Sequence, residues 1–255
     1  MQFVDLHNDA ICLLPWQQFL EHIKHAEHAG AGTVLSSVWT TNMSDPISEI
    51  KKYRQLIDNT RTKINLPMHI EDAWFLNEQN VDDVIATRPY SVGLTWNQNN
   101  NLAGGAHGDG ELTDLGRSMI ERLTKSGVVI DLAHLNKKSF HQVADQLTGQ
   151  RLFCSHTCFD EINPHPRNID REQIQRIVDS DGIVGLTLVN EFLGDSGVAG
   201  HIKYFHGNWG TENLGIGTDF FGAPDMAFND YNRLQQYLKD HDVHIKSHDI
   251  SRTLD

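Results

Sequence analysis

Three features that would place a protein in a special class are scarce in this sequence: cysteine, basic charge and long apolar runs. Three unevenly spaced cysteines in 255 residues predict a reducing compartment. No apolar stretch approaches the roughly 18 residues that cross a bilayer, and the opening residues lack a signal-peptide pattern. The formal net charge of −13 disfavours nucleic acid and anionic membranes as partners. We therefore expect a cytoplasmic protein that binds neither.

The sequence also lacks glycine-rich phosphate loops, linkers, low-complexity tracts and internal repeats. Their absence argues against an open dinucleotide-binding sheet and against a division into several domains. What the chain does contain is a series of strand-like runs separated by helical patterns, at intervals of ~30 residues. The expected strands are Gln2–Asp9, Thr33–Trp39, Pro67–Glu71, Tyr90–Thr95, Gly127–His134, Arg151–His156, Gly182–Val189 and Asn213–Asp219.

Helix signals fill the intervals between these strands. Residues 113–126 carry an apolar stripe at helical spacing, and Asn136 is a favourable N-cap for the next helix. Asp170 and Gln173 have the spacing of a capping box. Eight parallel βα units close naturally into a barrel, and about 250 residues is the usual length of one. We predict an α/β fold, a single (β/α)8 barrel in which residues 1–255 form one catalytic domain.

The first expected strand ends in a His-x-Asp pair, His7 and Asp9. Side chains two residues apart on a strand share a face, so both should point the same way from the strand end. An imidazole and a carboxylate aimed at one point are two ligands of a divalent metal. The pair alone is a weak signal, and its meaning depends on where the other histidines and carboxylates fall.

Four further strands end in a histidine or a carboxylate, namely Glu71, His134, His156 and Asp219. In a barrel the carboxyl ends of the strands meet on one face, where active sites form. The combined set has more ligands than one zinc ion uses. It suits two divalent metals that share Glu71, hold a bridging hydroxide and polarise a carbonyl. Asp219 is then left as the proton carrier.

Six short motifs follow one another along the chain. They are Asp5-Leu6-His7-Asn8-Asp9, Gly93-Leu94-Thr95-Trp96-Asn97, Asp131-Leu132-Ala133-His134, Ser155-His156, Arg167-Asn168-Ile169 and Gly217-Thr218-Asp219-Phe220-Phe221-Gly222. Through them the chain resembles the membrane dipeptidase (renal dipeptidase) family of zinc peptidases, from residue 3 to about residue 222. Any one of these motifs is weak evidence, whereas six in order are strong.

The resemblance implies a (β/α)8 barrel with two Zn²⁺ ions that hydrolyses dipeptides, often with a D-residue at the C-terminal position. It implies that His7 and Asp9 bind one zinc ion. The other ion is then bound by His134 and His156, and Glu71 bridges the two. The cysteines and the anchor of the membrane-bound members are absent, which fits a soluble microbial-type member.

The resemblance also assigns residues that act on the substrate. Glu71 and Asp219 are the expected catalytic carboxylates, with Asp219 as the acid/base residue. Arg167 is the expected clamp on the substrate carboxylate, because its fork of donors fits that group. Trp96 is expected beside the substrate, where vertebrate members carry a substrate-binding histidine. Phe221 stands where the family usually has a second Asp.

We therefore expect a zinc-dependent dipeptidase, a hydrolase whose partner is a small dipeptide. The sequence does not determine the oligomeric state, and a homo-oligomer is possible. It also leaves open a metal-dependent amidohydrolase acting on another small amide, ester or lactone, which indifference to a free C-terminal carboxylate would distinguish. A third reading is a barrel that binds metal or peptide without turnover, and an assay with added zinc would separate it from the other two.

The remaining histidines and cysteines have simpler interpretations. His22, His25 and His28 lie three residues apart and are expected on a solvated helix face. Cys154 and Cys158 flank the histidine of the sixth strand. We expect both to be small packing residues rather than metal ligands.

Overall fold

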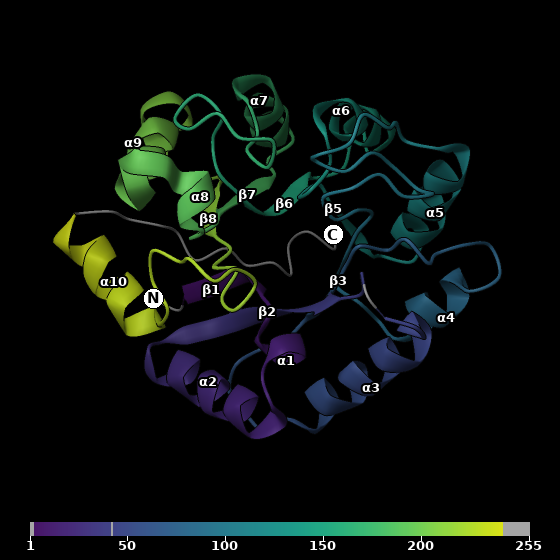
Figure 1. The fold of residues 1–255 in the computed structure, drawn as a ribbon, viewed down its shortest axis with the longest axis horizontal. Coiled ribbons are helices and arrows are strands. Elements are labelled where there is room, and N and C mark those ends of the chain that lie inside the picture. Colours follow the sequence, from purple (N-terminus) through teal and green to yellow (C-terminus); the bar gives the residue numbers. More distant parts are fainter. Residues whose placement is uncertain (1–2, 42, 242–255) are drawn as a thin grey trace.

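The computed structural model describes residues 3–41 and 43–241, and in this part of the chain eight parallel strands close into one barrel (Figure 1). The strands are β1 (Phe3–Asn8), β2 (Ala31–Trp39), β3 (Met68–Glu71), β4 (Ser91–Gly93), β5 (Val129–Asp131), β6 (Phe153–Thr157), β7 (Ile183–Leu186) and β8 (Leu214–Ile216). They follow chain order around the barrel, and β1 pairs with β8 to complete it. The predicted (β/α)8 barrel is confirmed.

Helices follow the strands, and the longer helices form a ring outside the barrel (Figure 1). They are α1 (Ala10–Leu13), α2 (Trp16–His28), α3 (Pro46–Asn59), α4 (Val81–Ala86), α5 (Asp114–Lys125), α6 (Lys137–Gln146), α7 (Arg171–Asp179), α8 (Asn190–Leu193), α9 (Gly197–Trp209) and α10 (Tyr231–Asp240). A short 3₁₀ turn, Gly194–Ser196, joins α8 to α9. The connections after β1 and β7 therefore each contain two α-helices.

Capping residues set the start of two helices that follow site-bearing strands. The Asn136 side chain accepts a hydrogen bond from Ser139 N at 2.8 Å and begins α6. At α7, the side chains of Asp170 and Gln173 each accept a bond from the other's backbone N–H, both at 3.0 Å. This is the predicted capping box, and it satisfies N–H groups that lack a partner within the helix.

The predicted strands are all present, but several are shorter than predicted. The run at residues 90–95 forms β4 only at Ser91–Gly93, and the run at 127–134 forms β5 only at Val129–Asp131. The residues that follow leave the ladder and continue over the carboxyl-terminal face of the barrel. Gln2, predicted to begin the first strand, lies outside the described residues.

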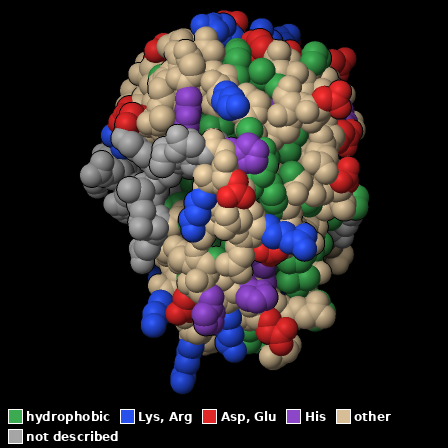
Figure 2. Space-filling view, turned by 90° about the vertical axis from the view of Figure 1, so that its left-hand side faces the viewer, with side chains coloured by type: hydrophobic (Ala, Val, Ile, Leu, Met, Phe, Trp, Pro, Cys, Tyr) green, Lys and Arg blue, Asp and Glu red, His purple; other side chains and the backbone are tan. Residues whose placement is uncertain are grey.

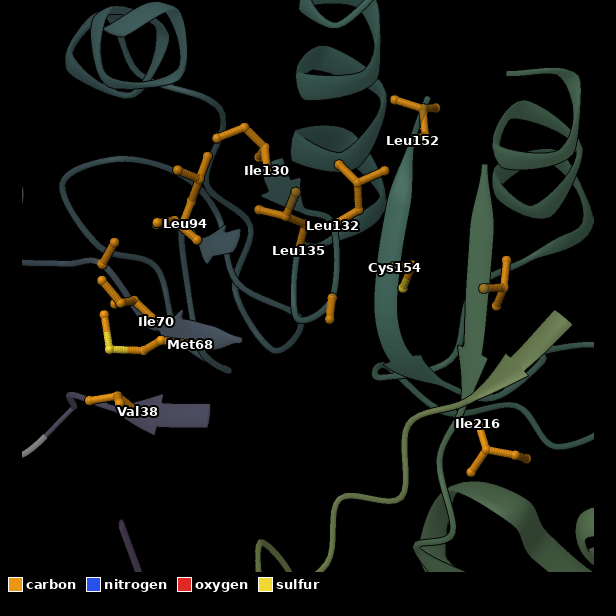
Figure 3. Packing of buried hydrophobic residues seen from close by; sticks show 14 of the residues in the cluster. Val38, Met68, Ile70, Leu94, Ile130, Leu132, Leu135, Leu152, Cys154 and Ile216 are labelled. Carbon is orange, nitrogen blue, oxygen red and sulfur yellow. The ribbon is translucent and has the colours of Figure 1, made fainter. Parts of the chain in front are cut away.

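The apolar core lies between the strands and the surrounding helices, as β3 illustrates. Met68 and Ile70 are fully buried and belong to the main hydrophobic cluster, together with Val38 of the neighbouring strand (Figure 3). Because successive side chains on a strand alternate, His69 and Glu71 point to the opposite side, into the barrel. The fold thus separates an apolar outer layer from a polar interior at the strand ends.

Figure 2 shows the side of the molecule that lies at the left of Figure 1. Basic and acidic side chains are scattered over this side, with no broad field of one sign. Among residues 3–41 and 43–241, no helix combines the length and the apolar character that a membrane crossing needs.

Candidate metal centre

The side chains predicted at the strand ends lie together at the carboxyl-terminal face of the barrel. Each belongs to a residue that is buried, with at most 9% of its surface exposed. They are His7 in β1, Asp9 directly after β1, Glu71 at the end of β3, His134 after β5, His156 in β6 and Asp219 after β8. The closed barrel therefore brings together groups from both ends of the described chain.

Barrel closure holds the groups of the first and last strands together. Asp219 N donates to His7 O at 3.0 Å, and Asp9 N donates to Phe220 O at 3.2 Å. As a result, the His7 Nε2 atom lies 3.4 Å from Asp9 Oδ2 and 3.9 Å from Asp219 Oδ1. These three side chains form one group of potential metal ligands.

Glu71 lies between the histidines of three strands. Its Oε1 atom is 2.9 Å from His134 Nε2, 3.7 Å from His156 Nε2 and 4.0 Å from His7 Nε2. Ligand atoms around a tetrahedral zinc ion at ~2.0–2.2 Å are separated by about 3.4 Å. The 2.9 Å contact is also a hydrogen-bond distance, whereas the spacings of 3.7 and 4.0 Å are too long for hydrogen bonds and leave room for a shared cation.

Two of the site residues adopt a left-handed backbone. His134 has φ 65° and Asp219 has φ 60°. This conformation is uncommon for residues other than glycine, and such strain concentrates at functional sites. Each residue follows the end of its strand, where the left-handed turn directs the chain across the carboxyl-terminal face.

The carboxylates make the cluster strongly attractive to a cation. Although burial opposes protonation, the three neighbouring carboxylates, Asp9 foremost, raise the pKa of His7 to about 10. Burial, together with the Asp9 carboxylate, raises the pKa of Asp219 to about 7. Burial lowers the pKa of His134 and His156, so both imidazoles stay neutral and available as ligands. Without metal, the cluster holds protons where it would otherwise hold a cation.

Orphaned polar atoms support the same interpretation. His7 Nε2 and Asp9 Oδ2 are buried and make no hydrogen bond within the described structure. Buried polar atoms without a partner are rare and need an explanation. Imidazole nitrogens and carboxylate oxygens are the ligand types that zinc takes. The residues at the strand ends therefore fit a divalent metal.

Hydrogen bonds to the far side of two histidines orient them toward the cluster. His134 Nδ1 lies 2.9 Å from Asn97 Oδ1, and His156 Nδ1 lies 2.8 Å from Ser155 Oγ. Neither partner was predicted from the sequence. Both stand inside the motifs that carry the family resemblance, and Ser155 directly precedes His156, but neither residue type by itself marks a histidine partner.

A second buried pair lies beneath the cluster and was also not predicted. His69 Nε2 is 3.5 Å from Asp131 Oδ2, and His69 Nδ1 is 2.9 Å from Ser91 Oγ. His69 precedes Glu71 by two residues and faces the same way, one step deeper in the barrel. Burial lowers the pKa of His69 to about 4, so this imidazole is neutral.

A cavity opens beside the cluster, with a volume of about 120 Å³. Trp96 is among its lining residues and packs edge-to-face against Trp39, with ring centroids 5.3 Å apart. Arg167 is not among the residues that line the cavity. Its guanidinium stacks on the ring of Phe192, which does line the cavity. The full lining is Asp9, Leu13, Trp39, Glu71, Trp96, Asn97, His134, Phe192, Asp219, Gly222 and Ala223.

Arg167 is almost fully buried, at 3% exposure. Its Nη2 donates to His156 O at 3.1 Å, whereas its Nε makes no hydrogen bond within the described structure. The guanidinium is close enough to Glu71 and Asp219 to pull the pKa of both carboxyls downward, against the upward effect of burial. Arg167 is thus a buried positive charge near Glu71 and Asp219, outside the cavity lining.

The remaining cysteine and histidine predictions have mixed outcomes. Cys154 and Cys158 are buried within the hydrophobic core, as expected for packing residues. His25 is exposed, as expected for a solvated face. The prediction for His22 is wrong, because its ring is partly buried edge-to-face against Phe221 at 5.0 Å. The three-residue spacing identified the helix but not which histidine turns toward the loop after β8.

The chain matches only part of the length of its curated relatives. An uncharacterized protein of Klebsiella pneumoniae, from the pqqA 5′ region, is 29% identical over 150 residues, which is 52% of this chain and 55% of that protein. The dipeptidase aclJ of Aspergillus oryzae is 28% identical over 123 residues, which is 44% of this chain and 28% of that protein. The chain therefore spans about half or less of the length of these relatives.

A solved structure resembles the whole chain. It is a metallopeptidase of Rhodobacter sphaeroides bound to a phosphinate mimic of the dipeptide L-Ala-D-Ala. The likeness has a TM-score of 0.77 at 17% identity and covers 100% of this chain and 98% of the other. At this identity the likeness concerns the fold.

The sequence profile of the membrane dipeptidases, peptidase family M19, matches residues 42–243. This range contains Glu71, His134, His156 and Asp219, while His7 and Asp9 precede it. The match covers well over half of the chain, and the barrel places the earlier pair beside the matched residues. The chain belongs to the membrane dipeptidase family, M19.

Proposed function

We propose that this chain is a dipeptidase with two zinc ions at the carboxyl-terminal face of its barrel. The observation that carries the proposal is the position of Glu71 Oε1, within 4.0 Å of the Nε2 atoms of three histidines. Membership of a metallopeptidase family supports it. One catalytic domain over residues 1–255 and a cytoplasmic location remain predictions from the sequence.

The ligands divide into two sets that share one carboxylate. His7 and Asp9 would hold one zinc ion, and His134 and His156 would hold the other. Glu71 would contribute to both, since its Oε1 lies between the two sets. When bound, the ions supply Lewis acidity and lower the pKa of a coordinated water.

Asp219 is the proposed acid/base residue. Its carboxyl lines the cavity, and in the metal-free cluster its pKa is raised to about 7. A carboxyl group that faces the substrate space can accept a proton and return it, and burial opposes the lowering of its pKa by a nearby cation. Asp219 would take a proton from the attacking water and deliver it to the departing amine. Glu71 would support the same chemistry as the carboxylate that both metal ions share.

The substrate would lie in the cavity between the cluster and the two tryptophans. A volume of about 120 Å³ is well below the ~300–1,000 Å³ of pockets for drug-sized ligands, which favours a very small substrate. Trp96 would contact it directly, and Arg167 would attract its carboxylate. The phosphinate mimic of L-Ala-D-Ala bound to the Rhodobacter metallopeptidase makes a D-residue at the C-terminal position a reasonable first substrate to test.

A second candidate is an amidohydrolase for another small amide, ester or lactone. One observation favours it: Arg167, the expected carboxylate clamp, does not line the cavity and is covered by Phe192. If Arg167 serves only as a buried counter-charge, nothing described at the cavity selects a free carboxylate. The two functions then differ in whether the substrate needs a free C-terminal carboxylate.

The test combines metal analysis with a matched substrate panel. Zinc-reconstituted protein should contain about two zinc ions per chain and should hydrolyse L-Ala-D-Ala or L-Ala-L-Ala. Amidation of the same dipeptides should reduce kcat/KM sharply if a carboxylate is recognised. Equal rates on free and amidated dipeptides would favour the amidohydrolase, and only trace zinc binding would refute both.

A further inference from the structure

One buried hydroxyl lies between histidines of the two proposed metal sites. Ser155 belongs to β6 and is fully buried. Its Oγ atom is 2.8 Å from His156 Nδ1 and 3.5 Å from His7 Nδ1. The two imidazole rings lie against each other, with centroids 3.8 Å apart. A single side chain therefore touches one histidine from each ligand set.

The contacts fall on the ring nitrogens that face away from the cluster. The Nε2 atoms of His7 and His156 point toward Glu71, at 4.0 and 3.7 Å. A neutral imidazole carries its proton on one nitrogen and a lone pair on the other. For Nε2 to bind a metal, the proton must sit on Nδ1. The Ser155 oxygen has two lone pairs, so it can accept a bond from both Nδ1–H groups.

A carboxylate fixes the position of this serine. Ser155 N donates to Asp131 Oδ1 at 2.9 Å. The same oxygen accepts a bond from Ala133 N at 3.0 Å, next to His134. Asp131 thus links β6 to the turn after β5. It fixes the position of Ser155 relative to that of His134. Asp131 Oδ2 is in turn directed at His69.

A close Ser–His pair can also be the sign of an activated nucleophile. That role does not fit here, because Ser155 is fully buried and is not among the residues that line the cavity. A substrate carbonyl in the cavity would have no path to Oγ. The hydroxyl is placed to act on the histidines rather than on a substrate.

We propose that Ser155 is a positioning residue shared by both metal sites, where it holds His7 and His156 as the Nδ1–H tautomers that direct Nε2 at the metals. The proposal rests on the two-metal site proposed above. Partners of this kind fix the ring orientation and raise the basicity of a ligating histidine. The shorter contact makes the effect larger for His156 than for His7.

The test compares two identical deletions at equally buried serines. Ser155→Ala removes the hydroxyl between the two proposed ligands. The control is Ser91→Ala, because Ser91 Oγ is also fully buried and lies 2.9 Å from a histidine Nδ1, that of His69. His69 belongs to neither proposed ligand set. Thermal unfolding of the metal-free variants shows whether each one folds.

Zinc affinity is then measured by competition with a chromophoric chelator. We expect Ser155→Ala to weaken zinc binding by about 10–100-fold, with the larger loss at the site of His156. Ser91→Ala should retain both affinities. Equal losses in the two variants, or no loss in Ser155→Ala, would overturn the proposal. Wild-type protein that binds fewer than two zinc ions would instead overturn the two-metal site.

A spectroscopic measurement on the unmodified protein covers the case in which Ser155→Ala does not fold. ¹⁵N-histidine NMR distinguishes the two tautomers of a neutral imidazole. With zinc bound, His7 and His156 should both carry their proton on Nδ1 and show a hydrogen-bonded Nδ1–H. A proton on Nε2 of His156, or an Nδ1–H of that ring without a hydrogen bond, would contradict the role of Ser155.

Discussion

At the scale of single residues, Gly222 shows how closely the backbone packs on two carboxylates of the proposed metal centre. A Cβ at this position would lie 2.3 Å from Asp219 Oδ1 and 2.6 Å from Asp9 Oδ2. Both carboxylates would have to move, because these distances are shorter than real Cβ contacts. The loop after β8 therefore needs a residue without a side chain where it crosses the site.

Gly222→Ala should consequently weaken metal binding while the barrel still folds. Displaced carboxylates lose their ligand geometry, so we expect zinc affinity to fall on the order of 10–100-fold. Gly207→Ala is the matched control, because a Cβ on Gly207 in α9 meets nothing within 4 Å. Isothermal titration with zinc measures both variants. Unchanged affinity in Gly222→Ala would mean that the Asp9 carboxylate does not bind zinc.

Asp219→Asn separates a proton carrier from a metal ligand. Asn has nearly the same shape but cannot accept and return a proton near neutral pH. General acid–base catalysis typically contributes 10²–10⁴-fold, so kcat on a dipeptide should fall by about that much while zinc content stays near wild type. Metal analysis and steady-state kinetics on the same sample decide the question. Loss of zinc together with activity would make Asp219 mainly a ligand.

The sequence predicted the side chains at the strand ends but not the residues that hold them. Histidine and carboxylate are ligand types in themselves, so their recurrence at strand ends was visible without a structure. Serine and asparagine are common everywhere, and Ser155 and Asn97 gain meaning only from a 2.8 or 2.9 Å contact with a ring nitrogen. Contacts of that kind depend on the barrel bringing distant strands together.

At the scale of elements, periodicity located the strands but not their ends or irregularities. The pairing of β1 with β2 shifts register between Asp5 and Asn8, so a strict two-residue alternation does not hold there. The Asp5 side chain accepts bonds from Thr218 N and from the Tyr231 hydroxyl of α10. A register shift has no signature in a single sequence, because it arises from the neighbouring strand.

The capping box of α7 is an element whose sequence signal and geometry agree, and its contribution can be measured. Asp170→Ala removes the side-chain acceptor for the Gln173 N–H, and such a loss typically costs ~1 kcal/mol. Urea unfolding of the metal-free protein should show this decrease in the free energy of unfolding. Asp170→Asn keeps a good capping side chain but loses the charge that faces Lys137. It should retain most of the stability; an equal loss in both variants would assign the effect to the ion pair instead.

At the scale of the whole molecule, metal loading and proton binding oppose each other at the centre of an acidic barrel. The chain carries a formal charge of −13, and three buried carboxylates surround one histidine, His7. Protons stand in for the cation in the metal-free cluster, since the pKa of His7 is raised to about 10 and that of Asp219 to about 7. Zinc binding should therefore release protons and strengthen as the pH rises.

The same opposition predicts how stability without metal depends on pH. A carboxyl whose pKa is raised by folding contributes stability that is present below its unfolded pKa and is lost as the pH rises through its folded pKa. For Asp219 this window runs from its ordinary value of 3.8 to about 7. Asp219→Asn is neutral at every pH and lacks this loss.

Between pH 4 and pH 8, metal-free wild type should therefore lose stability relative to Asp219→Asn, by an amount on the order of 2–4 kcal/mol. Added zinc should shrink or reverse the difference at pH 8, because a bound cation favours the ionised carboxylate. Thermal unfolding of chelator-treated and zinc-loaded samples of both proteins measures it. A difference between the two metal-free proteins that stays constant from pH 4 to pH 8 would mean that Asp219 ionises normally, and that burial beside Asp9 does not store a proton at the centre of the barrel.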